Sequence, residues 1–277
     1  MIKTKFDVES YTKEYINKTN SHLYIKPIKE LEKIVAHYTI TFPNEDNDIK
    51  EGSVLNLVPD VSGCFVFKFF DQLSIKVWGP TTEVVTVKND LNIADCRFFV
   101  EFLPGGLYRI LGIGLNELLN KKIDLEDIQL SLYEEINNEI MKMNSFDEIV
   151  DFINQILLRE VQKYKVNINI YKWIEDIDRQ HKIMNPCDIA TALGISERQL
   201  HRYFNRYVGM GVKKYSKYVN VNHLIKELIE KDLLDLTFDY HYFDQSHFNH
   251  TFKEVCQTTP THYIENLSDF YNELYKF

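Results

Sequence analysis

Apolar and polar residues alternate along residues 34–42, the first stretch of the chain with a clear repeat. Ile34, Ala36, Tyr38, Ile40 and Phe42 are apolar or aromatic, and three of the four residues between them are polar. This period of two predicts a β-strand. Similar short stretches follow, separated by turn-forming residues, at 53–58, 63–70, 73–78, 82–88 and 97–103. Short strands at this spacing predict a small antiparallel β-barrel or sandwich.

The pattern differs on either side of these strands. Residues 1–33 are polar with scattered apolar positions, which predicts one helix or an irregular entry to the domain. After a break at Pro104, a short helix is predicted at 107–113, and helical spacing resumes over 115–163. The last part of this region has an apolar stripe at helical spacing, which predicts packing on its own domain or, alternatively, an oligomer contact. Its residues are Ile149, Phe152, Ile153, Ile156, Leu157 and Val161.

Residues 185–207 have the pattern of two short helices joined by a tight turn. Asn185 followed by proline is a favourable helix start, because proline needs no backbone donor at the first helical position. Gly194 ends the first helix, where a left-handed residue is favoured. Ser196 and Gln199 form a capping box that starts the second helix. Helices are also predicted before and after this motif, at 167–180 and 212–231.

The second helix of the motif has an apolar stripe and a basic stripe. Leu200, Tyr203, Phe204 and Tyr207 recur at the spacing of a buried helix face. Arg198, Arg202 and Arg206 recur every four residues on another face. Stacked arginines repel one another, and an anionic partner would offset that repulsion. Arginine, glutamine and asparagine are also the side chains that read base edges in the major groove of DNA, although a solvated helix face is the simpler alternative.

The same layout recurs about 47–48 residues later, over residues 233–255. Phe248, Thr251, Phe252 and Val255 occupy the positions of the first apolar stripe. A repeated helix-turn-helix joined by a long helix is a stronger indication of DNA binding than one motif alone. Two such units on one face could enter successive major grooves roughly 34 Å apart.

Composition places the chain among globular proteins of two domains. It has 277 residues, of which 44% are hydrophobic and 26% charged. No apolar run reaches the length of a membrane span, and the polar start is not a signal peptide. Four widely separated cysteines with no CxxC pair favour reduced thiols. The expected location is therefore the cytoplasm, with no membrane partner.

The net charge of −9 is unevenly distributed. Residues 161–277 contain 15 basic and 15 acidic residues, so residues 1–160 carry the whole excess. Within 195–226 there are seven basic residues and one acidic residue, whereas 227–277 has three basic and ten acidic. Positive potential is therefore concentrated at the first helix-turn-helix and at the start of the helix after it.

Two segments of the sequence closely resemble a known protein family. DIATALGISERQLHRYFNRYVG and FDQSHFNHTFKEVCQTTPTHYI, within about 186–264, resemble the AraC/XylS family of bacterial transcription regulators. A weaker resemblance over 23–128 includes HYTITFP, LVPDVSGCFVFKF, VWGP, FFVEFLPGG and LEDI. These segments look like an uncharacterised cupin-like sensor domain found in some of these regulators. The resemblance implies a DNA-binding C-terminal domain regulated by an N-terminal barrel.

Several positions depart from the family pattern. His241 replaces the glycine of the second turn, where a left-handed conformation would cost about 1 kcal/mol. Thr237 replaces an alanine at the helix contact, and His250 replaces a basic residue in the second recognition helix. The other departures are Glu254, which stands at the position of Arg206 in the repeat, Asn220 and His223 in place of arginines, and Glu101 in place of a sensor-domain arginine. These changes weaken the case for strong DNA contact by the second unit.

The sequence therefore predicts an α+β multidomain protein that is not an enzyme and needs no cofactor. Residues 1–163 are expected to form a cupin-like antiparallel β-barrel with flanking helices. Residues 164–277 are expected to form an all-α domain of two helix-turn-helix units joined by a long helix. The predicted base contacts are Arg198, Gln199, Arg202, Asn205, Gln245, Ser246, Asn249 and His250. The predicted phosphate contacts are Ser196, Arg206, Lys213, Lys214, Lys217 and Lys253.

An effector pocket in the barrel is a further hypothesis. The candidates are aromatic or charged residues in otherwise apolar strands: Tyr38, Phe67, Lys68, Trp78, Phe99 and Glu101. Aromatic residues at these spacings also fit an ordinary core. The other expected partners are double-stranded DNA, a small-molecule effector, RNA polymerase, and a second copy of the chain.

Two other classes of function remain open from the sequence. One is a ligand-binding or protein-interaction regulator whose second helix-turn-helix has degenerated, with the acidic 227–277 contacting a protein. The other is a cupin-like enzyme, which is disfavoured because residues 1–160 contain only His22 and His37 as potential histidine ligands. The cluster His241, His247, His250 and Cys256 fits no zinc spacing, and no nucleophile elbow or phosphate-binding glycine loop is present.

Overall fold

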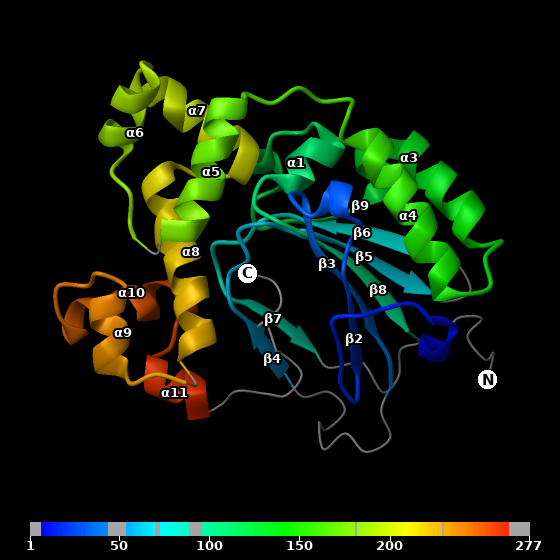
Figure 1. Ribbon diagram of the computed structural model, residues 1–277, viewed down its shortest axis with the longest axis horizontal. Coiled ribbons are helices and arrows are strands. Elements are labelled where there is room, and N and C mark those ends of the chain that lie inside the picture. The colour runs from blue at the N-terminus through cyan, green and yellow to red at the C-terminus, as the bar shows by residue number, and fades with distance from the viewer. Residues whose placement is uncertain are drawn as a thin grey trace.

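A computed structural model of the chain describes residues 7–43, 54–69, 73–88, 96–180, 182–228 and 230–265. Strands form most of the first part of the chain, and helices form most of the rest (Figure 1). The strands are β1 (Asn17–Lys18), β2 (His22–Ile25), β3 (Val35–Thr41), β4 (Val54–Leu57), β5 (Cys64–Phe69), β6 (Leu73–Trp78), β7 (Val85–Lys88), β8 (Arg97–Phe102) and β9 (Lys122–Asp124). Two short 3-10 helices, η1 (Val8–Ser10) and η2 (Lys29–Leu31), flank β1 and β2.

The helices fall into two groups along the chain. The first group is α1 (Gly106–Leu111), α2 (Leu115–Leu118), α3 (Leu125–Ile140) and α4 (Phe146–Glu160). The second group is α5 (Ile168–Gln180), α6 (Pro186–Leu193), α7 (Glu197–Val208), α8 (Val212–Glu227), α9 (Leu233–Asp239), α10 (Gln245–Cys256) and α11 (Pro260–Glu265). In Figure 1 the second group lies along one side of the sheet, with α8 running between the pair α6–α7 and the group α9–α11.

Seven strands form one antiparallel sheet in the order β1-β2-β3-β8-β5-β6-β9, and β4 pairs with β7 in a separate ladder. Over the described ranges this sheet has two edges, β1 and β9, and does not close on itself. The antiparallel arrangement of short strands that the sequence predicted is confirmed, whereas the described strands do not close into the predicted barrel. Alternation shows that a strand has one buried face, but it does not specify which strands pair.

Three strands lie in regions for which the sequence predicted no strand. β2 is buried at all four positions, so no alternation marks it within the segment predicted to be helical or irregular. β1 has only two residues and β9 only three, too few to show any period. β9 interrupts the predicted helical region 115–163 and adds a strand to the sheet beside β6.

One face of the sheet is covered by α3 and α4 (Figure 1). Tyr38 of β3 and Phe98 of β8 stack at a ring distance of 5.6 Å, and Phe146 of α4 lies 6.3 Å from Phe98. The Tyr38 hydroxyl donates a 2.7 Å hydrogen bond to the side-chain carbonyl of Asn154 on α4. The predicted stripe of α4 packs on this face, with Ile149 and Ile153 almost fully buried.

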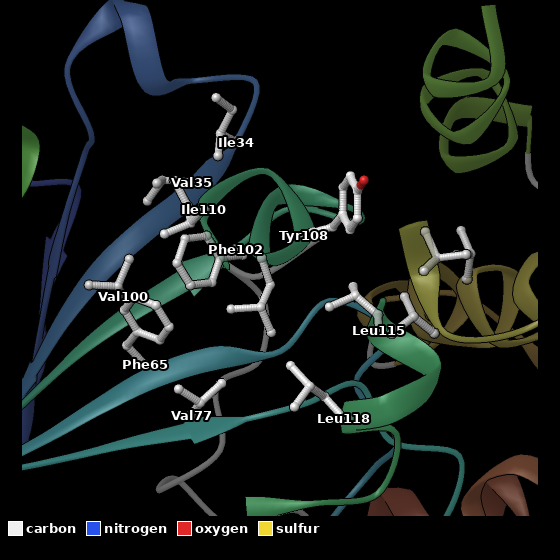
Figure 2. Close-up of a cluster of buried hydrophobic side chains, with 14 of the residues drawn as sticks. Ile34, Val35, Phe65, Val77, Val100, Phe102, Tyr108, Ile110, Leu115 and Leu118 are labelled. Atoms are coloured by element: carbon white, nitrogen blue, oxygen red, sulfur yellow. The ribbon is translucent and has the colours of Figure 1, made fainter. Parts of the chain in front are cut away.

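The same core continues toward α1 and α2. Figure 2 shows residues of the sheet, including Phe65, Val100 and Phe102, meeting Ile110 of α1 and Leu118 of α2. All five are 3% exposed or less. Burial of this apolar surface fixes α1 and α2 on the sheet, and these two helices also contact α7.

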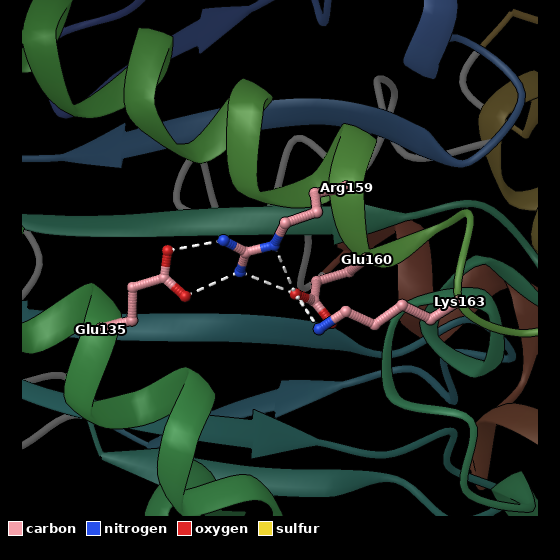
Figure 3. Close-up of polar contacts among 4 residues, drawn as sticks. All are labelled: Glu135, Arg159, Glu160 and Lys163. Carbon is pink, nitrogen blue, oxygen red and sulfur yellow. Dashed lines mark hydrogen bonds and ion pairs between the residues drawn. The ribbon is translucent and has the colours of Figure 1, made fainter.

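A charged cluster joins α3 to α4 (Figure 3). Arg159 of α4 donates to both carboxylate oxygens of Glu135 on α3, at 2.6 and 2.7 Å. It also contacts the carboxylate of Glu160, which is fully buried and accepts a 2.7 Å bond from Lys163. The guanidinium of Arg159 lowers the pKa of Glu135. Two cations thus offset the cost of burying the Glu160 carboxylate at the end of α4.

Candidate DNA-binding surface

The first helix-turn-helix, α6–α7, is capped as the sequence predicted. The Asn185 side chain accepts a 3.1 Å hydrogen bond from the backbone of Cys187, and Pro186 occupies the first turn of α6. Gly194 has a φ of 63°, and no atom lies within 4 Å of where its Cβ would be. Backbone conformation alone therefore favours glycine at this position. Ser196 and Gln199 form the reciprocal capping box at the start of α7.

The two predicted stripes of α7 lie on different faces. Leu200 and Phe204 are fully buried, and Tyr207 is 4% exposed. Arg198 and Arg202 are exposed on the solvent side of the helix, one turn apart. No hydrogen bond or ion pair within the described residues involves either guanidinium. Their donors are therefore available to a ligand, and the fork geometry of arginine suits base edges and phosphates.

The two amides on α7 are partly used within the chain. The side-chain carbonyl of Gln199 accepts bonds from the backbone and hydroxyl of Ser196, at 3.0 and 3.1 Å. The Asn205 amide donates a 2.7 Å bond to the backbone carbonyl of His201, and its side chain is only half-exposed. Of the four predicted base contacts on this helix, the two arginines are therefore the most available.

The predicted phosphate contacts near α7 and α8 have different environments. Lys213 is exposed at the start of α8, and Lys214 is exposed with its ammonium 5.6 Å from the ring of Tyr218. Lys217 instead forms an ion pair with Glu254 of α10, and its side chain is 20% exposed. Lys217 therefore links α8 to the second unit within the protein. A phosphate would have to compete with Glu254 for it.

Arg206 lies where α7 meets the first part of the chain. Its guanidinium is 5.4 Å from the ring centre of Tyr108 on α1, and the Tyr108 and Tyr207 rings are 4.8 Å apart. The Tyr207 hydroxyl accepts a 2.9 Å hydrogen bond from the backbone of Asn167, just before α5. No sequence pattern pointed to this contact, because Tyr207 and Tyr108 are separated by almost a hundred residues and either could serve as ordinary core.

The second unit, α9–α10, repeats the first in outline. Asp244 caps α10 by accepting a 2.7 Å bond from the backbone of His247. Phe248, Phe252 and Val255 are at most 1% exposed, as the repeat predicted. The second unit is therefore a folded counterpart of the first.

The turn of the second unit shows the predicted departure from glycine. His241 has a φ of 58°, the left-handed conformation that Gly194 adopts in the first unit. Thr237 is 2% exposed, and its hydroxyl donates a 2.7 Å bond to the carbonyl of Leu233. Its extra polar atom is thus satisfied within α9, so the helix tolerates threonine where the family has alanine.

The outer face of α10 is polar but carries little positive charge. Gln245, Ser246, His250 and Lys253 are exposed, and Asn249 is half-exposed. Residues 227–265 contain eight acidic and two basic residues. The positive charge that could attract an anionic ligand is consequently greater around α7 than around α10.

The six predicted effector-pocket residues do not share one face of the sheet. Tyr38 and Phe67 are fully buried on the face beneath α3 and α4. By the strand pairing, the other four lie on the opposite face: Lys68, Trp78, Phe99 and Glu101. The ammonium of Lys122 sits 3.6 Å above the Trp78 ring. The structure therefore divides the predicted pocket between the two faces of the sheet and assigns Tyr38 and Phe67 to the core.

No group of three or more histidine, cysteine, aspartate or glutamate side chains within the described ranges could hold a metal ion. Among the helices that the structure describes, none is both long enough and apolar enough to cross a bilayer.

Sequence comparison identifies the class of the C-terminal region. The family model described as a helix-turn-helix domain matches residues 189–266, which include α7 to α10 and most of α6. This region is an AraC-type helix-turn-helix domain, so the resemblance to AraC/XylS regulators is confirmed there. No curated protein sequence matches the chain.

Among solved structures, the chain is similar to ToxT from Vibrio cholerae. A structure of ToxT with an unsaturated fatty acid bound is 12% identical, with 93% of this chain and 98% of that chain covered and a TM-score of 0.45. Another ToxT structure is 13% identical, with coverage of 79% and 95% and a TM-score of 0.43.

Proposed function

We propose that the chain is a sequence-specific DNA-binding transcription regulator in which α7 makes the main base contacts. The observation that carries this proposal is the exposed pair Arg198 and Arg202 on α7, within a confirmed helix-turn-helix domain. No described acidic side chain forms an ion pair with these arginines, so their guanidinium donors are available to an anionic ligand.

The other polar residues divide between positioning and base reading. Lys213, Lys214, Arg206 and Ser196 lie at or near the ends of α7, where contacts to phosphates would set its register in the groove. On α10, Gln245, Ser246, Asn249 and His250 are the candidates for base contact, and Lys253 is the candidate for phosphate contact. Because α10 carries less positive charge, its contribution would be smaller.

The test begins with duplexes selected by the full chain from a random pool, followed by affinity measurements by fluorescence anisotropy at fixed salt. Replacing Arg202 by alanine should weaken binding to the selected duplex by roughly 1–3 kcal/mol, because one bidentate base contact is lost. Binding to an unrelated duplex should change much less, since that affinity comes mainly from phosphates.

Glu197→Ala is the matched control. Glu197 is exposed in the first turn of α7, before Arg202, but is acidic, so its loss should not weaken binding. If the chain selects no sequence, or if Arg202→Ala binds the selected duplex as wild type does, the proposal is wrong.

The first part of the chain is proposed to regulate this activity. We propose residues 1–163 as a sensor region and residues 164–277 as the DNA-binding domain, with the link between α4 and α5 as the boundary. The sheet face that carries Lys68, Trp78, Phe99 and Glu101 is the candidate for effector contact. RNA polymerase and a second copy of the chain are the candidate protein partners.

A second candidate function is a protein-interaction regulator whose second unit does not read DNA. It is favoured by exposed apolar side chains on that unit: Leu234 is 57% exposed, Phe238 67% and Phe243 91%. The acidic surroundings would match a basic protein partner. Footprinting discriminates the two functions. Protection of a single DNA segment the length of one half-site favours this candidate over a regulator in which both helix-turn-helix units contact DNA.

A further inference from the structure

Helix α8 is buried on most of its surface although it carries many polar residues. Ten of its sixteen residues are buried, and three of these, Ser216, Asn220 and Asn222, are polar and 1% exposed. Polar side chains at such depth are expensive unless they find partners. The partners of α8 therefore show which parts of the molecule it connects.

One set of partners lies in the helices before α8. The Tyr215 hydroxyl donates to the carbonyl of Ile174 on α5 at 3.4 Å, and His223 lies 3.0 Å from the carboxylate of Asp178 on α5. The Ser216 hydroxyl accepts a 3.0 Å bond from the backbone of Met184, just before α6. These contacts tie α8 to the region that carries the first helix-turn-helix.

A second set lies in the second helix-turn-helix. Lys217 pairs with Glu254 of α10, and the Asn220 amide donates to the hydroxyl of Tyr242 at 3.4 Å. The first contact holds α10 itself and the second holds the turn before it, so both fix the second unit against α8. The orientation of α10 therefore depends on the position of α8.

A third set lies in the first part of the chain, more than 130 residues away. The Tyr218 hydroxyl donates a 2.9 Å bond to the carbonyl of Thr82, and the Asn222 amide donates a 3.2 Å bond to the carbonyl of Pro59. We refer to residues 58–63 and 79–84 as the carbonyl loops. They connect β4 to β5 and β6 to β7, so they are attached directly to two central strands of the sheet.

The carbonyl loops are themselves held in place. The Asp60 carboxylate accepts bonds from the backbones of Ser62 and Gly63 at 2.8 and 3.0 Å, and the Thr81 backbone donates to the Asp60 carbonyl at 2.6 Å. The Asn120 side chain bonds both the backbone and the hydroxyl of Thr82, at 2.7 and 3.2 Å. A shift of β5 or β6 would therefore move the loops as units and carry the two carbonyls with them.

We propose that α8 couples the sheet to the paired helix-turn-helix units through Tyr218 and Asn222, so that the carbonyl loops set the relative orientation of α7 and α10. This inference rests on the proposed DNA-binding function, because the orientation of the two units matters only if both meet one DNA duplex. The coupling needs a continuous chain of contacts with a defined position. The sheet strands, the carbonyl loops, α8 and α10 supply that chain.

The test releases the two hydrogen bonds in the full chain with Tyr218→Phe combined with Asn222→Ala. Tyr215→Phe is the matched control, because it removes a hydroxyl from the same helix but one that bonds α5. Hydrogen exchange is measured on the backbone amides of residues 58–63 and 79–84. The release variant should exchange faster in both carbonyl loops while α5 and α7 remain protected, and the control should match wild type there.

The second readout is a pair of affinities measured for each variant. One is for the full duplex that wild type selects, and the other is for a shorter duplex that contains only the half-site contacted by the first unit. The release variant should change the ratio of the two affinities by about fivefold or more, the lower end of typical coupling between sites. The control should leave the ratio within about twofold of wild type. If the release variant binds the full duplex more tightly, the orientation held by the two hydrogen bonds opposes DNA binding. If it binds more weakly, that orientation favours DNA binding.

Two results would overturn the inference. One is unchanged exchange in the carbonyl loops of the release variant, which would show that α8 does not hold them. The other is faster exchange with an unchanged affinity ratio, which would show that their position does not matter to the units. If wild type selects no duplex, the proposed function fails, and the coupling of the sheet to α8 is then decided by the exchange measurement alone.

Discussion

The residue that ends the first helix of each helix-turn-helix unit has the same backbone conformation but a different side chain. Gly194 has a φ of 63° and His241 a φ of 58°. An L-residue with a Cβ is strained in this conformation, although histidine is more tolerant of it than most residues. The second turn therefore stores strain that the first turn lacks.

Removing the Cβ at position 241 and adding one at position 194 should change the stability of the chain in opposite directions. His241→Gly should stabilise the chain by about 0.5–1 kcal/mol, and Gly194→Ala should destabilise it by about 1 kcal/mol. Because no atom lies near the Gly194 Cβ position, backbone strain is the only cost there. Denaturant unfolding measures both changes, and a destabilising His241→Gly would contradict the strain assigned to the second turn.

His22 on β2 is a second residue with a measurable consequence. It is 6% exposed, its ring nitrogen lies 2.8 Å from the Ser21 hydroxyl, and burial lowers its pKa to about 4. An unfolded chain binds a proton at this histidine below its ordinary pKa of about 6.5. Between these two values the unfolded state holds a proton that the folded state does not, so stability falls as the pH falls.

The expected loss attributable to His22 between pH 6.5 and pH 4 is up to about 3 kcal/mol in the free energy of unfolding. Other groups also titrate in this range, so the measurement compares wild type with His22→Gln at each pH. The two curves should converge as the pH falls toward 4. Parallel curves over that window would show that His22 is protonated in the folded state.

At the scale of elements, the helix-turn-helix units were the most predictable part of the molecule. Their signals are local: Pro186 begins α6, Gly194 ends it, and the Ser196–Gln199 capping box starts α7. The repeat then predicted the buried face of α10 at Phe248 and Phe252. The caps and turns depend on residues only a few positions apart, and the repeat is visible by direct comparison of two stretches of the chain, which is why sequence alone sufficed.

The sheet was less predictable because strand pairing is not local. The alternating strands were located correctly to within a few residues, but β2 is uniformly buried and β1 and β9 are too short to show a period. The pairing of β4 with β7, and hence the open sheet, depends on segments thirty residues apart. The same limit applies to the effector hypothesis, since the two faces of the sheet become distinct only when the pairing is known.

At the scale of the whole molecule, the contacts between the first part of the chain and the helix-turn-helix domain are its least predictable feature. Tyr108 packs on Tyr207, and α8 reaches the carbonyl loops through Tyr218 and Asn222. Each of these side chains could equally have completed a local core, and no spacing rule joins them. Their arrangement gives the first part of the chain a direct mechanical connection to α7 and α8.

Charge distribution at this scale separates the roles of the two units. Positive charge is concentrated over 195–226, while 227–265 is acidic, and Lys217 is paired with Glu254 between them. This charge distribution therefore favours the first unit as the dominant DNA reader. The two units differ at a pair of positions that correspond in the repeat, Arg202 on α7 and His250 on α10.

The most direct measurement is the affinity of Arg202→Ala and His250→Ala for the same selected duplex at one salt concentration. Both residues are exposed at the same position of their recognition helices, so the substitutions are matched. Arg202→Ala should lose roughly 1–3 kcal/mol of binding free energy, and His250→Ala less than about 0.5 kcal/mol. Equal losses, or a larger loss for His250→Ala, would contradict the claim that α7 dominates DNA recognition.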